Sequence, residues 1–164
     1  MGGNLFLIDA FLVRFEYRRL REFYNSRGED LLRSGRLPVL AGEEKKLLFD
    51  DMIVYWPCIK ERATDRIVAA AMLCREVTAR GSTGIVEYVL VDRDFRHKGL
   101  GRAIMNDLHR KGLHDWNCRK FFLHSENEEA REDARGMYEK MGYILEEGTD
   151  CYYSATRKAI LANL

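Results

Sequence analysis

The sequence predicts an α/β protein with one central mixed, mostly antiparallel sheet of six to seven strands and helices on both faces. Short apolar and β-branched runs such as Ile85 to Val91 are typical of strands. Strand, helix, strand, helix and strand then alternate, which is typical of a sheet covered by helices. The length, 164 residues, suits one domain spanning 1–164.

The elements follow from apolar spacing and from glycine and proline punctuation. We expect strands at Leu5 to Ile8, Met52 to Ile59, Arg66 to Val77, Ile85 to Val91, Lys120 to His124, Tyr143 to Leu145 and Cys151 to Tyr153. We expect helices around Phe11 to Tyr24, at Lys45 to Asp51, at Gly99 to Lys111 and at Glu128 to Met141. Thr64-Asp65 and Gly81 to Gly84 are predicted turns, and residues 155–164 receive no assignment.

Composition excludes several classes of protein. Lys and Arg number 27 against 26 Asp and Glu, so no global field attracts nucleic acid or an anionic membrane. The longest apolar run, Ile67 to Cys74, is too short to span a bilayer, and no signal peptide is visible. The four cysteines form no C-x-x-C pair, so we expect reduced thiols, no metal site and a cytoplasmic location.

The most informative stretch runs from Val91 to Ala103, after a buried-type strand and at the start of a helix. A helix N-terminus presents unpaired N–H groups, and glycine lets the backbone approach a ligand closely. Its basic residues, Arg93, Arg96, His97, Lys98 and Arg102, suit phosphate oxygens. A Walker A pattern is absent, and Ile104 occupies the place of the third small residue of a Rossmann fingerprint. An ordinary glycine-rich helix start is the remaining alternative.

Two motifs resemble the GNAT superfamily of N-acetyltransferases. Arg96 to Gly101 resembles its pyrophosphate loop, R/Q-x-x-G-x-G/A, at every defined position. Met137 to Tyr143 resembles its aromatic-Tyr-x-Lys-x-Gly-aromatic run, with Met137 in place of the first aromatic residue or Leu. The family often has Asn seven residues before this Tyr, where Arg131 stands here, and Asn127 lies four residues further back. The resemblance covers about Arg66 to Tyr153.

The resemblance implies a GNAT-type fold that binds acetyl-CoA through residues 66–153, while residues 1–57 shape the acceptor site. A splayed strand would polarise the thioester carbonyl through a backbone N–H near Leu90 or Val91. The expected acetyl-CoA contacts are Leu90, Val91, Arg96, His97, Lys98, Gly99, Leu100, Gly101, Arg102 and Asn127.

Two residues are candidates for the proton transfers. Tyr138 is the candidate general acid, since a phenol of reference pKa about 10 stays protonated beside a thiolate; the alternative is a core tyrosine. Glu87 is the candidate general base, and we expect apolar neighbours to raise its pKa; the alternative is a strand-end or salt-bridged Glu. His124 is a weaker candidate base, and His109 and His114 are interpreted as surface residues.

The acceptor is the least determined part of the prediction. The acidic residues are Glu126, Glu128, Glu129, Glu132, Asp133, Glu146, Glu147 and Asp150. They either complement a helix dipole or guide a cationic amine. We expect an acetyl-CoA-dependent N-acetyltransferase acting on a small primary amine such as a polyamine, with no nucleic-acid or membrane partner; a homodimer stays open. The alternatives are a protein or peptide acetyltransferase and a non-catalytic acyl-CoA-binding domain.

Overall fold

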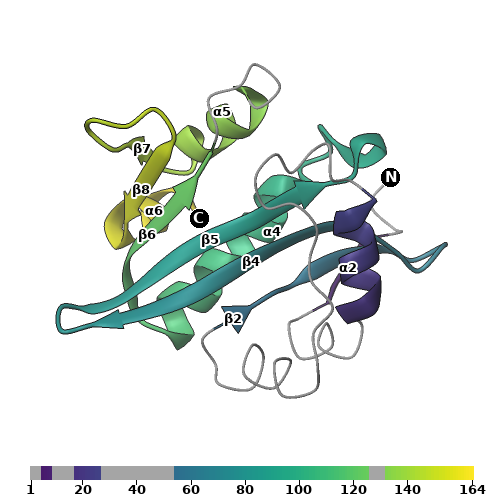
Figure 1. Cartoon of the computed structure of the whole chain (residues 1–164), viewed down its shortest axis with the longest axis horizontal. Coiled ribbons are helices and arrows are strands. Elements are labelled where there is room, and N and C mark those ends of the chain that lie inside the picture. The colour runs from purple at the N-terminus through teal and green to yellow at the C-terminus, as the bar shows by residue number, and fades with distance from the viewer. Residues whose placement is uncertain (1–4, 9–16, 27–53, 126–131) are drawn as a thin grey trace. The chain divides into compact units, whose positions relative to one another are not determined.

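The computed structural model describes residues 5–8, 17–26, 54–125 and 132–164 (Figure 1). The strands are β1 (Leu5–Ile8), β2 (Val54–Tyr55), β3 (Cys58–Glu61), β4 (Arg66–Thr78), β5 (Gly81–Val91), β6 (Cys118–His124), β7 (Ile144–Leu145) and β8 (Tyr152–Thr156). The α-helices are α2 (Tyr17–Asn25), α4 (Leu100–Arg110), α5 (Glu132–Lys140) and α6 (Arg157–Asn163). A 3₁₀ turn, η3 (Arg93–Phe95), precedes α4, and a π-helical turn, η4 (Lys111–Asp115), follows it.

The strands form one eight-stranded sheet in the order β1-β3-β4-β5-β6-β8-β7, with β2 paired to β4. The pairs β1–β3, β3–β4, β6–β8 and β7–β8 are antiparallel, whereas β5 and β6 are parallel. A parallel pair needs a crossover connection, and α4 is the helix between β5 and β6 in the chain. The predicted fold class, a mixed and mostly antiparallel sheet with helices, is confirmed.

The predicted strand Met52 to Ile59 is wrong in its extent, and this adds a strand to the expected number. Met52 lies outside the described residues, and Trp56 and Pro57 separate β2 from β3. Proline has no N–H to donate to a ladder, so a strand is readily interrupted there.

The predicted turn at Gly81 to Gly84 is also wrong, because β5 begins at Gly81 and the turn is Ala79–Arg80. A Cβ on Gly84 would lie 2.7 Å from the Phe121 ring. This glycine therefore permits close packing rather than a change of chain direction.

The unassigned tail contains α6. The Thr156 side chain accepts a hydrogen bond from the Ala159 N–H at 3.2 Å, which is an N-cap. The predicted helix at Lys45 to Asp51, most of the first predicted helix and the first residues of the predicted helix Glu128 to Met141 lie outside the described residues.

The chain divides into two compact units, residues 1–72 with 88–108 and residues 73–87 with 109–164. In the first unit, Figure 1 shows α2 in front of β4 and α4 behind it. The buried core of this unit includes Leu20, Tyr24, Trp56, Val68, Ala70, Leu90, Ile104, Met105 and Leu108. That of the second includes Leu73, Val86, Leu113, Trp116, Phe121, Leu123, Met141, Tyr143, Tyr153 and Ile160.

Three further observations concern disulfides, membrane-spanning helices and metal sites. None of the four cysteines, all of which lie in the described part of the chain, forms a disulfide. Within the ranges that the structure describes, no helix is long and apolar enough to cross a bilayer. The same residues contain no group of three or more His, Cys, Asp or Glu side chains that could hold a metal ion.

Candidate active site

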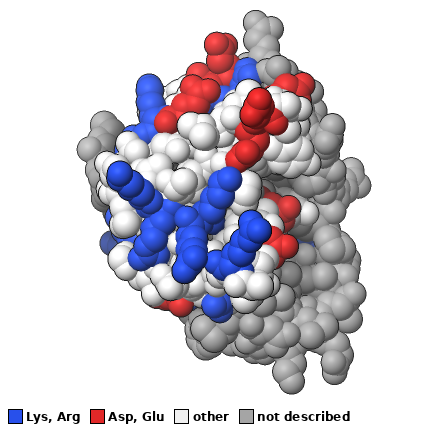
Figure 2. Space-filling model, turned by 90° about the vertical axis from the view of Figure 1, so that its left-hand side faces the viewer, with Lys and Arg blue, Asp and Glu red and all other residues white. Residues whose placement is uncertain are grey.

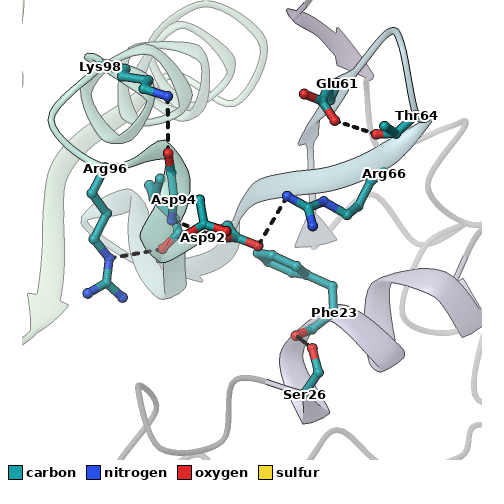
Figure 3. A network of polar contacts seen from close by, with 10 residues as sticks. Phe23, Ser26, Glu61, Thr64, Arg66, Asp92, Asp94, Arg96 and Lys98 are labelled. Atoms are coloured by element: carbon teal, nitrogen blue, oxygen red, sulfur yellow. Dashed lines mark hydrogen bonds and ion pairs between the residues drawn. The ribbon is translucent and has the colours of Figure 1, made fainter.

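The connection from β5 to α4 is fixed by a buried aspartate. Asp92 is 2% exposed, and its N–H donates to the Val68 carbonyl of β4 at 2.8 Å. Its side chain accepts from the Asp94 N–H at 3.1 Å and thereby caps η3 (Figure 3). Arg66 lies 3.9 Å from the same carboxylate and places a positive charge beside it. The loop therefore leaves the sheet in one defined direction.

Two residues of this loop have left-handed backbone conformations just before α4. His97 has φ 58° and Gly99 has φ 78°. Ala103 N–H donates to the Gly99 carbonyl at 3.0 Å, so helical hydrogen bonding begins there. The first-turn N–H groups of a helix have no intrahelical partner, and left-handed residues beside right-handed ones turn successive N–H groups toward one side. This backbone can hold an anion.

Two basic side chains of the loop also hold its backbone, as Figure 3 shows. Arg96 Nε donates to the Val91 carbonyl at 3.1 Å, and Lys98 Nζ donates to the Asp94 carbonyl at 3.0 Å. Lys98 Nζ also lies 4.9 Å from the centroid of the Phe95 ring. His97 and Arg102 are exposed. Arg96 and Lys98, two of the loop residues predicted from the motif, thus stabilise the conformation of the loop.

Strand β5 departs from regular geometry near its end. Its parallel register with β6 runs from Ser82 to Val86, and Tyr88, two residues later, has φ 53°. A non-glycine residue in this region is strained and marks a local irregularity of the strand. Beyond it, Leu90 is 4% exposed and Val91 is half-buried. The irregularity precedes the two residues predicted to polarise the thioester.

Three aromatic residues at this irregularity were missed by sequence reasoning. The Tyr24 hydroxyl donates to the Tyr88 carbonyl at 2.5 Å, and Trp56 Nε1 donates to the Tyr24 hydroxyl at 3.2 Å. These partners are 64 and 32 residues apart in the chain. No local pattern marks such a contact, because it forms only when α2 and the strands pack together.

Glu87 lies on the more exposed face of β5. Its side chain is exposed, whereas those of Ser82 and Val86 on the opposite face are buried. The apolar residues expected on the same face, Ile85, Val89 and Val91, are half-buried, whereas the Glu87 side chain reaches solvent. Burial, together with the Glu87 charge, raises the pKa of the Cys74 thiol to about 11, so Cys74 stays protonated near neutral pH.

Tyr138 is 7% exposed near the end of α5, and its ring packs edge-on against Tyr143 with centroids 6.1 Å apart. Its carbonyl accepts the Tyr143 N–H at 3.1 Å, while the Gly142 N–H donates to the Glu139 carbonyl at 3.0 Å. With Gly142 at φ 96°, these bonds form a Schellman motif. Gly142 and Tyr143, the last two residues of the second motif, therefore end α5 and fix the backbone at Tyr138.

His109 is a buried residue, so its interpretation as a surface residue is wrong. It is 1% exposed, its Nε2 lies 2.8 Å from the Tyr143 hydroxyl, and its ring packs edge-on against Phe121. Burial lowers the pKa of His109 to about 4, so the ring is neutral at neutral pH. His114 is exposed as expected.

The other predicted residues are dispersed. His124 packs against Tyr152, with ring centroids 4.9 Å apart. Glu132 and Asp133 are exposed in the first turn of α5, where they complement the helix dipole. Glu146 accepts from Lys120 Nζ at 3.0 Å, and hydrogen bonds from Ser154 and Lys120 lower its pKa. Asn127 and the acidic residues at 126, 128 and 129 lie outside the described residues.

The second unit also carries a local concentration of positive charge. Figure 2 shows Lys and Arg side chains gathered on the face that carries the tip of the β4–β5 hairpin. Arg75 donates to Ser82 Oγ at 3.2 Å, and Arg119 packs against Gly81. Burial raises the pKa of the Cys118 thiol, and Arg75 and Arg157 oppose that rise. The near-zero net charge therefore conceals a strongly basic region.

Comparison with known proteins identifies the family. The model of the acetyltransferase (GNAT) family matches residues 20–143. A solved Trypanosoma brucei acetyltransferase is 25% identical, with 90% of this chain and 97% of that chain covered and a TM-score of 0.67. No curated protein sequence matches the chain.

Two more distant solved structures share the fold. An aminoglycoside acetyltransferase from an uncultured soil metagenomic sample has TM-score 0.73 at 15% identity, covering 89% of this chain and 95% of its own. Mutant forms of the Vibrio cholerae spermidine/spermine N-acetyltransferase have TM-score 0.66 at 16% identity, covering 98% of each chain. The resemblance inferred from the two motifs is thus confirmed: the chain belongs to the acetyltransferase (GNAT) family and is an acetyl-CoA-dependent N-acetyltransferase.

Proposed function

We propose that the chain binds the pyrophosphate of acetyl-CoA on the Arg96 to Gly101 loop and transfers the acetyl group directly to a small cationic amine, such as a polyamine. The observation that carries the proposal is the pair of left-handed residues, His97 and Gly99, directly before the first turn of α4. Such a backbone directs N–H groups toward an anion, and Arg102 adds positive charge. Leu90 and Val91 would supply the backbone N–H that polarises the thioester carbonyl.

Two side chains divide the proton transfers in this proposal. The amine nitrogen bonds to the thioester carbonyl carbon, and Glu87 accepts the amine proton directly or through a water molecule. The exposure of Glu87 supports this role, since an exposed carboxylate can release the proton to solvent. The carbon–sulfur bond then breaks, and the Tyr138 hydroxyl donates its proton to the leaving thiolate. The Schellman motif, which fixes the backbone at Tyr138, supports its role as a positioned acid.

The acceptor class is supported by two observations. Glu132 and Asp133 are exposed acidic residues at the start of α5 and could attract a cation. The Vibrio cholerae and soil enzymes of the same fold are named as acting on spermidine or spermine and on aminoglycosides, which are cationic amines. A panel of polyamines, aminoglycosides and lysine peptides, followed by release of free CoA, tests the class. Turnover of the peptides alone would contradict it.

The chain offers a matched pair of glycines for testing the phosphate loop. Gly99 and Gly148 both have φ 78°, and a Cβ on either would meet no atom within 4 Å. Aspartate therefore introduces the same backbone strain and charge at both. A carboxylate about 5 Å from the pyrophosphate should cost about 3 kcal/mol at an effective dielectric constant of about 20, roughly 100-fold in affinity. Calorimetry with CoA should show this loss in Gly99→Asp alone, and equal affinities in the two variants would refute the site.

A further inference from the structure

Tyr24 makes the contact that fixes the irregular residue of β5. It is 0% exposed, and its hydroxyl donates to the carbonyl of Tyr88, which has φ 53°. The direction of this hydrogen bond is determined, because an indole N–H can only donate. Trp56 Nε1 donates to the Tyr24 hydroxyl oxygen at 3.2 Å, so the hydroxyl proton is directed to the Tyr88 carbonyl.

The rings of the same three residues pack together. Ring centroids are 5.7 Å apart for Tyr24 and Trp56, 5.8 Å for Tyr24 and Tyr88, and 5.4 Å for Trp56 and Tyr88. Trp56 is 2% exposed. The cluster is therefore closely packed around a chain of two hydrogen bonds, and the Tyr24 ring would keep its place without the hydroxyl.

A separate ion-pair cluster anchors α2. Arg19 Nη1 lies 2.9 Å from Asp65 Oδ2, and Lys60 Nζ lies 3.2 Å from Asp65 Oδ1. Lys60 is 3% exposed in β3, and Asp65 is in the β3–β4 turn. These contacts join α2 to the β3–β4 turn independently of the Tyr24 hydroxyl.

The backbone after Tyr88 carries the N–H groups of Leu90 and Val91. A left-handed residue changes the direction of the strand, and this conformation persists only where surrounding contacts hold it. The hydrogen bond from Tyr24 is such a contact, since it fixes the orientation of the peptide group between Tyr88 and Val89. Any rotation of that group alters the direction of the following N–H groups.

We infer that Tyr24 is a positioning residue for acetyl transfer: its hydroxyl holds the Tyr88 carbonyl and thereby directs the Leu90 or Val91 N–H to the thioester carbonyl. This role rests on the proposed function. Tyr24 lies in the first third of the chain, 64 residues before the Tyr88 residue that it contacts. Tyr24 acts through the backbone of Tyr88.

The test compares Tyr24→Phe with Tyr55→Phe. Tyr24→Phe removes two hydrogen bonds of the Tyr24 hydroxyl, to Tyr88 and from Trp56. The control removes the partly buried hydrogen bond that the Tyr55 hydroxyl donates to Asp107 Oδ2 at 2.7 Å in the same unit. The probe is acetyl-CoA labelled with ¹³C at the thioester carbonyl, observed by difference infrared spectroscopy. In Tyr24→Phe the carbonyl band should move to higher wavenumber at unchanged acetyl-CoA affinity, because a misdirected donor polarises the bond less. The band should not move in Tyr55→Phe.

Backbone amide NMR of the free protein gives a readout that needs no acetyl-CoA. The Leu90 and Val91 amide signals should shift in Tyr24→Phe and not in Tyr55→Phe. Unshifted amides, or an unmoved carbonyl band in the folded, acetyl-CoA-bound variant, would overturn the role of Tyr24. If wild-type protein binds no acetyl-CoA, the proposed function fails, while the amide signals still decide whether Tyr24 positions the strand.

Should Tyr24→Phe not fold, 3-fluorotyrosine introduced at position 24 alone keeps the hydroxyl and makes it a stronger donor. The Leu90 and Val91 amide signals should then shift from their wild-type positions, because the stronger donor changes the hydrogen bond to the Tyr88 carbonyl. Unshifted amide signals in that folded protein would equally overturn the inference.

Discussion

The buried imidazole of His109 should make the protein acid-sensitive in a defined pH range. Burial lowers the His109 pKa from 6.5 to about 4. The unfolded chain therefore takes up a proton at this residue more readily than the folded protein does. The stability associated with the neutral ring is complete above about pH 6.5 and is lost as the pH falls through 4.

The size of the effect follows from the pKa difference. A shift from 6.5 to about 4 corresponds to about 3 kcal/mol between the upper and lower limits. At about pH 5 roughly two thirds of this is lost, so wild-type protein should lose about 2 kcal/mol relative to pH 7.5 through this residue alone. Carboxyl groups also titrate in the acidic range. The loss of stability in wild-type protein is therefore compared with that in a variant that lacks only the His109 ring, so that the carboxyl contribution cancels.

His109→Gln removes the titrating ring and leaves an amide that can hydrogen-bond the Tyr143 hydroxyl. Urea unfolding of both proteins at about pH 7.5 and pH 5 should show that wild-type protein loses about 2 kcal/mol more than the variant. The exposed His114→Gln is the matched control and should retain the wild-type pH dependence. An equal pH dependence in His109→Gln and wild-type protein would refute the assignment of acid sensitivity to burial of this ring.

Three further outcomes are expected. Glu87→Gln should lower turnover at neutral pH more than acetyl-CoA affinity, and an unchanged acidic limb of the pH–rate profile would identify another base. Tyr138→Phe should lower kcat about 10²–10⁴-fold, with the lower end favoured for a reactive amine, at a stability cost of about 0.5–1.5 kcal/mol; a normal kcat in a normally folded variant would remove it from the mechanism. Gly112→Ala should destabilise by about 1–3 kcal/mol, because its Cβ would lie 2.5 Å from the buried Phe121 ring. The control Gly136→Ala, with no atom within 4 Å, should be neutral or stabilising by up to about 1 kcal/mol, as thermal melts of both would show.

The parts of the fold that local spacing specifies were predictable. β1 has its predicted bounds, and α4 begins one residue after the predicted Gly99. The Arg96 to Gly101 motif and the end of α5 could be recognised because glycine, basic residues and the helix boundary lie within a few residues of one another. These features depend on backbone conformation and hydrogen bonds between near neighbours, which a short sequence encodes directly.

The remaining features depend on which distant residues meet. Gly81 to Gly84 suggests a turn until Phe121 is seen packed against Gly84, and His109 suggests a surface residue until Phe121 and Tyr143 are seen to bury it. Tyr24 carries no local signal at all. By itself the sequence determined the fold class and the family, and it predicted the loop for the cofactor. Only the tertiary structure decided the burial of His109, the exposure of Glu87 and the contact of Tyr24 with Tyr88, because burial and hydrogen-bond partners arise from packing between segments far apart in the chain.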